Sequence, residues 1–264
     1  MKIACIQFQS TNQKKANIHK AVDMVLRAAR KGAKLIALPE VFSYRGYLNT
    51  ALSSTVGERI PGESLAPLMA AAKAQKVFIL AGSVYEKAAQ GHKFFNTSCF
   101  ISLDGKIKAV YRKKNLFRAR VGGRAIDETC HFLAGKSVSV ARAGVFTVGL
   151  SVCYDLRFPR HFSDVACAGA NVMCVPSAFT HQTGTAHWEI LLRARAIENL
   201  SYVLAPNQIG TDEKGVRCYG NSMIVGPWGN ILARASTAKE EIIYADLNLK
   251  AIKDARTILP NVIQ

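Results

Sequence analysis

The sequence lacks the features that would place it among membrane, secreted or zinc-binding proteins. No run approaches about 18 uninterrupted apolar residues, so we expect no membrane-spanning helix. The first residues, MKIACIQFQS, have neither the long apolar core nor the small-residue cleavage site of a signal peptide, and we expect a strand there. No two cysteines have the spacing C-x-x-C, which argues against a zinc ribbon and against a thioredoxin-like motif.

The cysteine pattern also argues against a disulfide framework. The chain has seven cysteines, an odd number without regular spacing, at positions 5, 99, 130, 153, 167, 174 and 218. Thiols that stay reduced are typical of the cytosol, so we expect a cytoplasmic protein. The six histidines show no ligand-like spacing, and the sequence predicts no metal site.

Acidic residues are scarce. The chain has 18 Asp and Glu against 35 Lys and Arg, which gives a net charge of +17. Residues 106–124, KIKAVYRKKNLFRARVGGR, hold eight basic residues and no acid, with Tyr111 and Phe117 between them. Such a run could bind a polyanion, but no nucleic-acid-binding motif accompanies it. We therefore interpret it as a solvated basic face and do not expect nucleic acid to be the partner.

The remaining composition, 49% hydrophobic and 20% charged over 264 residues, is that of a globular protein with a substantial core. Helical and strand patterns alternate, which predicts α/β layers, and hairpins predict mixed sheets in a single domain over 1–264. The expected helices are 15–31, 65–75, 159–168 and 187–199. The expected strands are 2–8, 33–40, 77–86, 94–103, 107–112, a hairpin over 137–155 turned at Gly144, and 171–179, 201–210, 221–229 and 241–249.

Three polar residues stand where apolar strands end, which is where α/β proteins commonly build sites. Glu40 ends LIALPE, Lys113 follows IKAVYR, and Cys153 follows VGLSV. Alone, each has an ordinary explanation: a solvated acid, part of the basic face, or a buried thiol. Together they form a chemical set, because a carboxylate can deprotonate a thiol and an ammonium can stabilise an oxyanion. We expect acyl transfer through a thioester, aided by the Tyr154 N–H in the turn after the cysteine.

The segments ALPEVF, YRKKNLF and SVCYDLRFP resemble the three signature motifs of the nitrilase superfamily of carbon–nitrogen hydrolases, and the similarity extends over nearly the whole chain. The resemblance implies an αββα sandwich of two mixed sheets, protomers that pair as homodimers or larger homo-oligomers, and no cofactor. It implies that Cys153 is the nucleophile, that Glu40 moves the proton, and that Lys113 stabilises the oxyanion. Glu128 in IDETC is the candidate for a second glutamate that positions the lysine.

Residues 176–199, PSAFTHQTGTAHWEILLRARAIEN, are similar to the branch that contains deaminated glutathione amidase and ω-amidase. The first activity is the closer match, so we expect a small carboxylate-bearing amide as substrate. Arg157 could pair with its carboxylate, although an ion pair with Asp155 or Glu198 is an equal alternative. Phe179 and Thr183 are further candidates for substrate contacts, whereas Trp188 falls on an apolar helix face and is expected in the core.

Three positions depart from the pattern of these relatives: Asn115 stands where the lysine motif usually has His, Asn221 replaces the His of GHS, and Arg160 replaces a usual Glu. They leave the substrate open. The alternatives to deaminated glutathione are an ω-amidase acting on 2-oxoglutaramate or 2-oxosuccinamate, and a carbamoyl-amide hydrolase or nitrilase. Outside enzymes, the alternative is a basic nucleic-acid-binding protein on the same fold.

Overall fold

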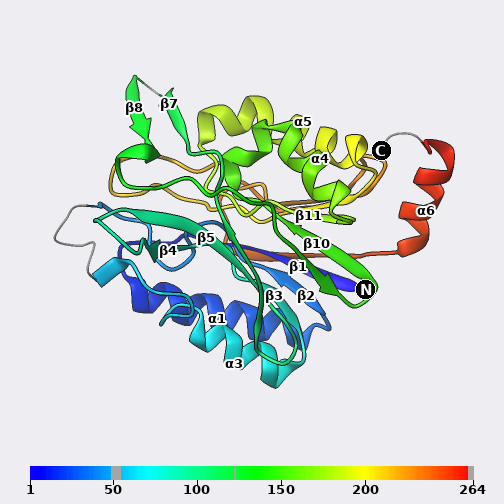
Figure 1. Ribbon diagram of the computed structural model, residues 1–264, viewed down its shortest axis with the longest axis horizontal. Coiled ribbons are helices and arrows are strands. Elements are labelled where there is room, and N and C mark those ends of the chain that lie inside the picture. Colours follow the sequence, from blue (N-terminus) through cyan, green and yellow to red (C-terminus); the bar gives the residue numbers. More distant parts are fainter. Residues whose placement is uncertain (49–54, 122, 261–264) are drawn as a thin grey trace.

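The computed structural model describes residues 1–48, 55–121 and 123–260, and its helices and strands lie in four layers (Figure 1). Two sheets face each other, and helices cover the outer side of each, so the predicted αββα sandwich is confirmed. No helix in the described part of the chain is long and apolar enough to cross a bilayer.

The first sheet contains seven strands, and the parallel strands β1, β2 and β3 form its centre. Antiparallel strands flank them, which makes the sheet mixed. The strand order is β15 (Glu241–Asp246), β1 (Lys2–Gln7), β2 (Leu35–Ala37), β3 (Phe78–Leu80), β5 (Phe94–Ile101) and β4 (Val84–Lys87), with β6 (Ile107–Arg112) also paired to β5.

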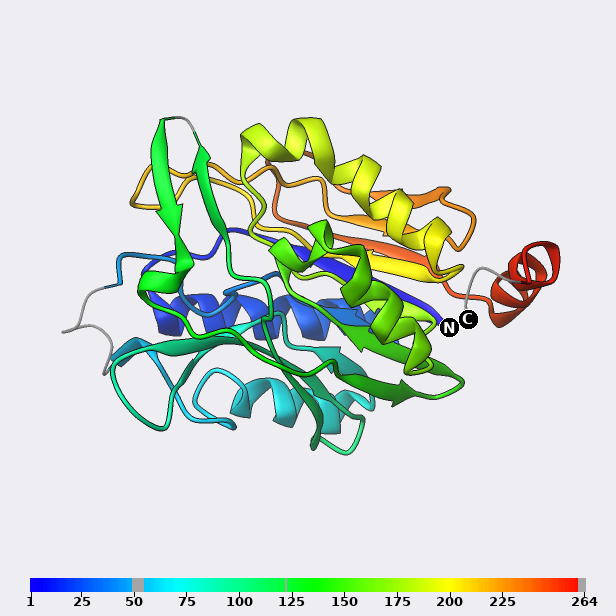
Figure 2. The same ribbon diagram turned by 45° about the horizontal axis from the view of Figure 1, so that its top comes forward.

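The second sheet contains six strands, with β10, β11 and β12 parallel at its centre. Its order is β14 (Ile231–Arg234), β13 (Met223–Val225), β12 (Tyr202–Ala205), β11 (Val172–Cys174), β10 (Phe146–Leu150) and β9 (Val140–Ala143). The turn between β9 and β10 contains Gly144 at φ +64°, which confirms the expected hairpin. A separate ribbon of β7 (Arg118–Val121) and β8 (Arg124–Asp127) projects from the body (Figure 2).

Helices α1 (Lys14–Arg30) and α3 (Ala66–Gln75) cover the first sheet, and α4 (Pro159–Cys167) and α5 (His181–Glu198) cover the second (Figure 1). The side chains of strand β1 alternate between the two apolar cores of the sandwich. Ile3 and Cys5 belong to the apolar core that includes the second sheet, whereas Ala4 and Ile6 pack in the core with α1 and α3. Successive side chains point to opposite faces of a strand, so one apolar strand supports two cores.

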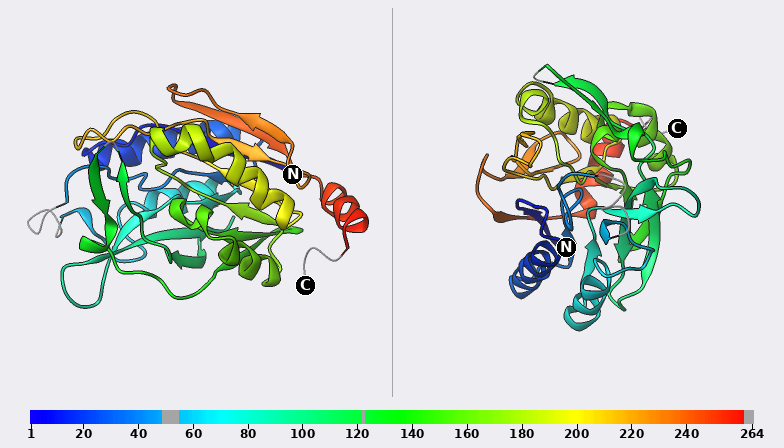
Figure 3. Two further views of the ribbon diagram at one scale, coloured as in Figure 1. Left: turned by 90° about the horizontal axis from the view of Figure 1, so that it is seen from above. Right: turned by 90° about the vertical axis from the view of Figure 1, so that its left-hand side faces the viewer.

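Several predicted boundaries were wrong. The strand expected over 77–86 is two strands, β3 and β4, separated by a turn with Gly82 at φ +41°. The helix expected from residue 187 begins at His181. The ribbon β7–β8, the strand β14 and the last helix, α6 (Leu249–Ile258), were not predicted; α6 extends from the end of the sandwich away from the ribbon (Figure 3).

Candidate active site

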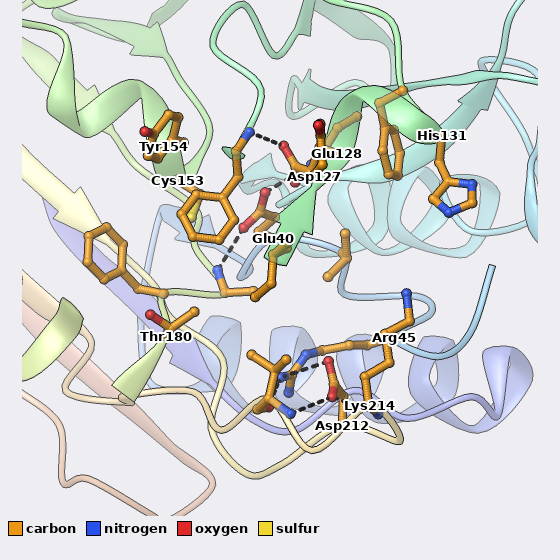
Figure 4. Close-up of a pocket in the computed structure, with 18 of the residues that line it drawn as sticks. Glu40, Arg45, Asp127, Glu128, His131, Cys153, Tyr154, Thr180, Asp212 and Lys214 are labelled. Atoms are coloured by element: carbon orange, nitrogen blue, oxygen red, sulfur yellow. Dashed lines mark hydrogen bonds and ion pairs between the residues drawn. The ribbon is translucent and has the colours of Figure 1, made fainter. Parts of the chain in front are cut away.

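The three residues at strand ends meet at one cavity of about 910 Å³ (Figure 4). Glu40 follows β2 of the first sheet, Lys113 directly follows β6, and Cys153 follows β10 of the second sheet. Cys153 begins the short helix η2 (Cys153–Arg157) with φ +47°, a left-handed conformation that a non-glycine residue adopts only when its surroundings hold it. The site therefore lies where the two sheets face each other.

Glu40 is buried, and three donors fix the orientation of its carboxylate. Its Oε1 accepts hydrogen bonds from Asn96 Nδ2 at 2.9 Å and from Lys113 Nζ at 3.0 Å. Its Oε2 accepts from the backbone N–H of Ala178 at 2.8 Å. The backbone oxygen of Glu40 also accepts from Gln208 Nε2, so both main chain and side chain are held. This carboxylate is presented in one orientation.

Lys113 is 1% exposed and lies between two carboxylates. Its Nζ donates to Glu40 Oε1, and it lies 3.0 Å from Glu128 Oε1 and 2.9 Å from Glu128 Oε2. Burial disfavours the ammonium, but the charges of Glu128 and Glu40 outweigh burial and keep the pKa of Lys113 well above its usual value. Glu128 Oε2 in turn accepts from the Phe117 N–H at 2.7 Å. Lys113 is thus a fixed, permanently charged group.

The surroundings of Cys153 favour the neutral thiol over the thiolate. Burial raises its pKa well above the ordinary range, the Glu40 carboxylate raises it further, and Lys113 opposes this only in part. After burial, the charge of Glu40 is the largest influence on the pKa of this thiol, and both residues line the same cavity (Figure 4). A thiol in this state needs a nearby base before it can act as a nucleophile.

The remaining predicted residues also line the cavity: Tyr154, Glu128, Arg157, Phe179 and Thr183. The Tyr154 N–H lies in the first turn of η2, where N–H groups have no intrahelical acceptor. Arg157 lies over the Phe179 ring at 5.1 Å, and its Nη1 lies 3.2 Å from His187 Nδ1. The two acids that the sequence offered as ion-pair partners of Arg157 have other partners. Glu198 pairs with Arg195, and Asp155 accepts from neutral donors.

The three departures from the family pattern lie outside the cavity lining. Asn115 donates to Asp155 through both its N–H and its Nδ2. Asn221 is buried and has φ +52°. Its backbone oxygen accepts a hydrogen bond from Trp188 Nε1 and so holds α5 in place. Trp188 is fully buried, as predicted. Arg160 is exposed and pairs with Asp164. Asn115 therefore does not line the cavity, although Lys113 and Phe117 on either side of it do.

Sequence reasoning missed Asn96, Arg45 and the loop that faces the triad. Asn96 interrupts the apolar strand β5 and holds Glu40, so a polar residue within that strand was a usable signal. Arg45 is buried, and its Nη2 donates to Val216 O and lies 3.5 Å from Asp212 Oδ2. These contacts hold the loop that contains Asp212 and Val216, which lines the cavity (Figure 4). Only the fold reveals those pairings. Among the described residues, no group of three or more His, Cys, Asp and Glu side chains could hold a metal ion.

A thiol, a carboxylate and an ammonium lie together at one cavity of an αββα sandwich, a set of groups that suits hydrolysis of carbon–nitrogen bonds. The family model described as carbon-nitrogen hydrolase matches residues 2–257, and the chain belongs to this family.

Similar proteins indicate which class of carbon–nitrogen bond is hydrolysed. Omega-amidase NIT2 of Homo sapiens is 35% identical over 98% of this chain and 92% of the relative. The crystal structure of Saccharomyces cerevisiae Nit3, of the nitrilase superfamily, superposes with a TM-score of 0.88 at 30% identity, over 99% of this chain and 94% of Nit3. A glutamate-to-glutamine mutant of an amidase from Nesterenkonia sp. AN1, whose active-site cysteine carries an acrylamide adduct, has a TM-score of 0.80 at 26% identity over 98% of both chains. The protein is an amide-hydrolysing enzyme with the nitrilase-like fold.

Proposed function

We propose that the protein hydrolyses a linear amide bond of a small carboxylate-bearing substrate through a thioester on Cys153. The observation that carries this proposal is the contact of Lys113 with Glu40 at 3.0 Å beside the buried thiol, on one wall of an open cavity. These groups supply a nucleophile, a base and an oxyanion donor without rearrangement.

In the proposed reaction, Glu40 takes the thiol proton as the sulfur of Cys153 attacks the amide carbon. The oxyanion that forms is stabilised by Lys113 Nζ and by the Tyr154 N–H, and one well-placed donor of this kind contributes about 3–4 kcal/mol. Glu40 returns the proton to the departing nitrogen, so the amine leaves neutral. Glu40 then deprotonates water, which attacks the thioester, and the thiol and the acid product are released. Glu128 positions Lys113 by accepting its hydrogen bond.

For the acyl group, we infer a 2-oxo dicarboxylic acid, with 2-oxoglutaramate as the first candidate substrate. Several relatives at about a third identity are named ω-amidases. Arg157, which lines the cavity, could donate charge-assisted hydrogen bonds to the free carboxylate. 2-Oxosuccinamate fits the same scheme with one methylene less.

Deaminated glutathione, the substrate that the sequence favours, remains the second candidate. It would yield 2-oxoglutarate and a cysteinylglycine dipeptide. A cavity of about 910 Å³ offers far more room than ammonia as leaving group needs, and the basic side chains of Lys214 and Arg217 are among those that line it. A leaving dipeptide with its own carboxylate could extend toward them.

One experiment tests the reaction and ranks the substrates. The purified protein is incubated with 2-oxoglutaramate, deaminated glutathione, a carbamoyl-amide and a nitrile, while ammonia, free dipeptide thiol and carbon dioxide are measured and intact mass is recorded. We expect turnover of one of the first two, with an acyl adduct on Cys153 and no activity in folded Cys153→Ala. Turnover of the carbamoyl-amide or nitrile alone would overturn the substrate class. Salt-sensitive nucleic-acid binding without any turnover would favour the binding-protein alternative.

We further propose that two copies associate through the outer face of α5. Ile190 and Ile197 of this helix are exposed, and Trp228 is exposed in the loop beside Ile197, where Gly229 contacts it. Apolar side chains gathered on a surface mark an interface. Sedimentation should show a dimer for the wild type and a monomer for Ile190→Glu, while Val145→Glu, an exposed control in the β9–β10 turn, should leave the dimer intact. Monomeric wild type would contradict this proposal.

We infer a cytoplasmic location from the seven cysteines, all of which are free thiols.

A further inference from the structure

We propose that Asp155 is a positioning residue, whose buried carboxylate ties the segment that carries Cys153 to the segment that carries Lys113. The proposal rests on the roles given above to these two residues. Asp155 is fully buried and does not line the cavity, so substrate does not reach it. The four groups that donate hydrogen bonds to it are all uncharged, and they come from both segments.

On the cysteine side, Asp155 closes the turn that presents the sulfur. Its Oδ2 accepts from the N–H of Val152 at 2.8 Å, and its own N–H donates to Val152 O at 3.1 Å. Val152 is the residue before Cys153, whose φ of +47° is a strained conformation. Strained backbone persists only where the surrounding structure determines it, and this pair of hydrogen bonds supplies that restraint.

On the lysine side, Asp155 holds residues before and after Lys113. Its Oδ2 accepts from Tyr111 Oη at 2.7 Å, and the same hydroxyl accepts from the N–H of Lys114 at 3.2 Å. Its Oδ1 accepts from Asn115 twice, from the N–H at 3.0 Å and from Nδ2 at 2.8 Å. Asn115, one of the departures from the family pattern, thus supplies a side-chain donor to this carboxylate.

The arrangement requires an ionised carboxylate. The four donors occupy the lone-pair sites of the two carboxylate oxygens of Asp155. In an asparagine at this position, an NH₂ group would replace one of these oxygens and would point toward two of the donors. Burial, and then the charge of Asp155, keep the pKa of Tyr111 well above its usual value, so the phenol remains a donor at every assay pH. The charge is retained in the interior because it is fully hydrogen-bonded.

The expected consequence is catalytic more than structural. Sulfur and ammonium belong to opposite sheets of the sandwich, and Asp155 couples the loops that carry them. Misplacement by about 1 Å costs on the order of 100-fold in rate. Substrate contacts at the cavity wall do not involve Asp155, so a loosened connection should lower kcat and leave KM nearly unchanged.

The test compares two buried tyrosines. Tyr111→Phe removes the hydroxyl that joins Asp155 to Lys114. Tyr202→Phe is the control, since Tyr202 Oη likewise donates one hydrogen bond and accepts one, to Asn248 O at 3.1 Å and from Asn248 N at 3.0 Å, and it does not line the cavity. We expect kcat to fall about tenfold in Tyr111→Phe with KM within about twofold, and kcat to stay unchanged in Tyr202→Phe at a similar loss of Tm.

Variants of Asn115 and Asp155 complete the test. Asn115→Ala should lower kcat about tenfold, and Asn115→His, which restores an N–H donor, should return most of it; Asp155→Asn should cost on the order of 100-fold. Iodoacetamide alkylation of Cys153, followed by peptide mass spectrometry, should shift to higher pH in Tyr111→Phe and Asn115→Ala, because Lys113 no longer lies in place to favour the thiolate.

Two results would overturn the proposal: unchanged kcat and unchanged alkylation in Tyr111→Phe and Asn115→Ala, or an equal fall of kcat in Tyr202→Phe. Failure of the proposed function looks different, since wild-type protein would then hydrolyse none of the amides. In that case the alkylation profiles alone decide whether Asp155 positions the two groups.

Discussion

Replacing Lys113 by methionine perturbs the site where its charges are most concentrated. The ammonium is 1% exposed and lies within 3.0 Å of both Glu40 and Glu128. Methionine keeps the length of the side chain but leaves two buried carboxylates side by side without a cation. Breaking a buried ion pair by removing one partner costs about 3–5 kcal/mol, which a domain of about 5–15 kcal/mol total stability can survive.

The pH dependence gives this prediction a second readout. With Lys113 gone, burial and mutual repulsion raise the pKa of the two carboxylates in the folded state above their unfolded values. Such groups favour the folded state while protonated, and this contribution is lost as pH rises through the folded pKa. Urea denaturation should therefore show a smaller gap between variant and wild type at pH 5 than at pH 8. Loss of the oxyanion donor should lower kcat on the order of 100- to 1,000-fold.

Lys114→Met is the matched control, because it removes the same charge one residue along the chain from a partly exposed side chain. It should change stability by no more than about 0.5 kcal/mol. The reasoning is refuted if Lys113→Met denatures like this control at pH 8, or if it keeps more than about a third of the wild-type kcat, well above the loss expected for one donor.

Three further predictions concern the thiol, the core and the rim. Burial and Glu40 raise the pKa of Cys153. In a Cys130→Ser background, the rate of iodoacetamide alkylation at Cys153 should therefore still rise with pH above the ordinary thiol pKa of about 8.5. A rate that levels off near that pH would contradict the raised pKa. Gly149→Ala places a Cβ 2.0 Å from a methyl of Val165, so the urea midpoint should fall by the equivalent of about 1–3 kcal/mol; an unchanged midpoint would show that β10 and α4 separate freely. Arg157→Met should raise KM for 2-oxoglutaramate about tenfold or more and leave turnover of propionamide, which has no carboxylate, nearly unchanged; equal effects on both amides would rule out carboxylate recognition.

The sequence indicated three polar residues that the structure places together, for a physical reason. An apolar strand ends where its burial ends, so a polar residue placed immediately afterwards lies at the edge of the sheet. Lys113 directly follows its strand, Glu40 and Cys153 stand three residues beyond theirs, and the structure brings all three to one cavity. Their hydrogen-bond partners do not follow from it. Asn96 and the Ala178 N–H belong to distant strands and loops, and only tertiary structure brings them to Glu40.

The missed start of α5 shows how packing overrides local preference. Residues 181–186, HQTGTA, contain Thr and Gly, which have low helix propensity. Gly184 is nevertheless helical because the ring of Tyr219 occupies the space of a side chain, 2.4 Å from where a Cβ would stand. The residue that weakens the helix in isolation permits the contact that stabilises it. A contact from residue 219 gives no local signal at residue 184.

Charge conservation explains how a thiol with a raised pKa can serve as nucleophile at this site. Burial opposes ionisation of Cys153 when the proton goes to water, because a new charge is then created in the interior. Transfer of the proton to Glu40 creates one anion and removes another, so the total charge of the buried groups does not change. Lys113 contacts Glu40 and lowers the pKa of Cys153, and it therefore stabilises the anion on either side of the transfer. The burial that keeps the resting thiol unreactive thus opposes the proposed internal proton transfer much less than it opposes ionisation to solvent.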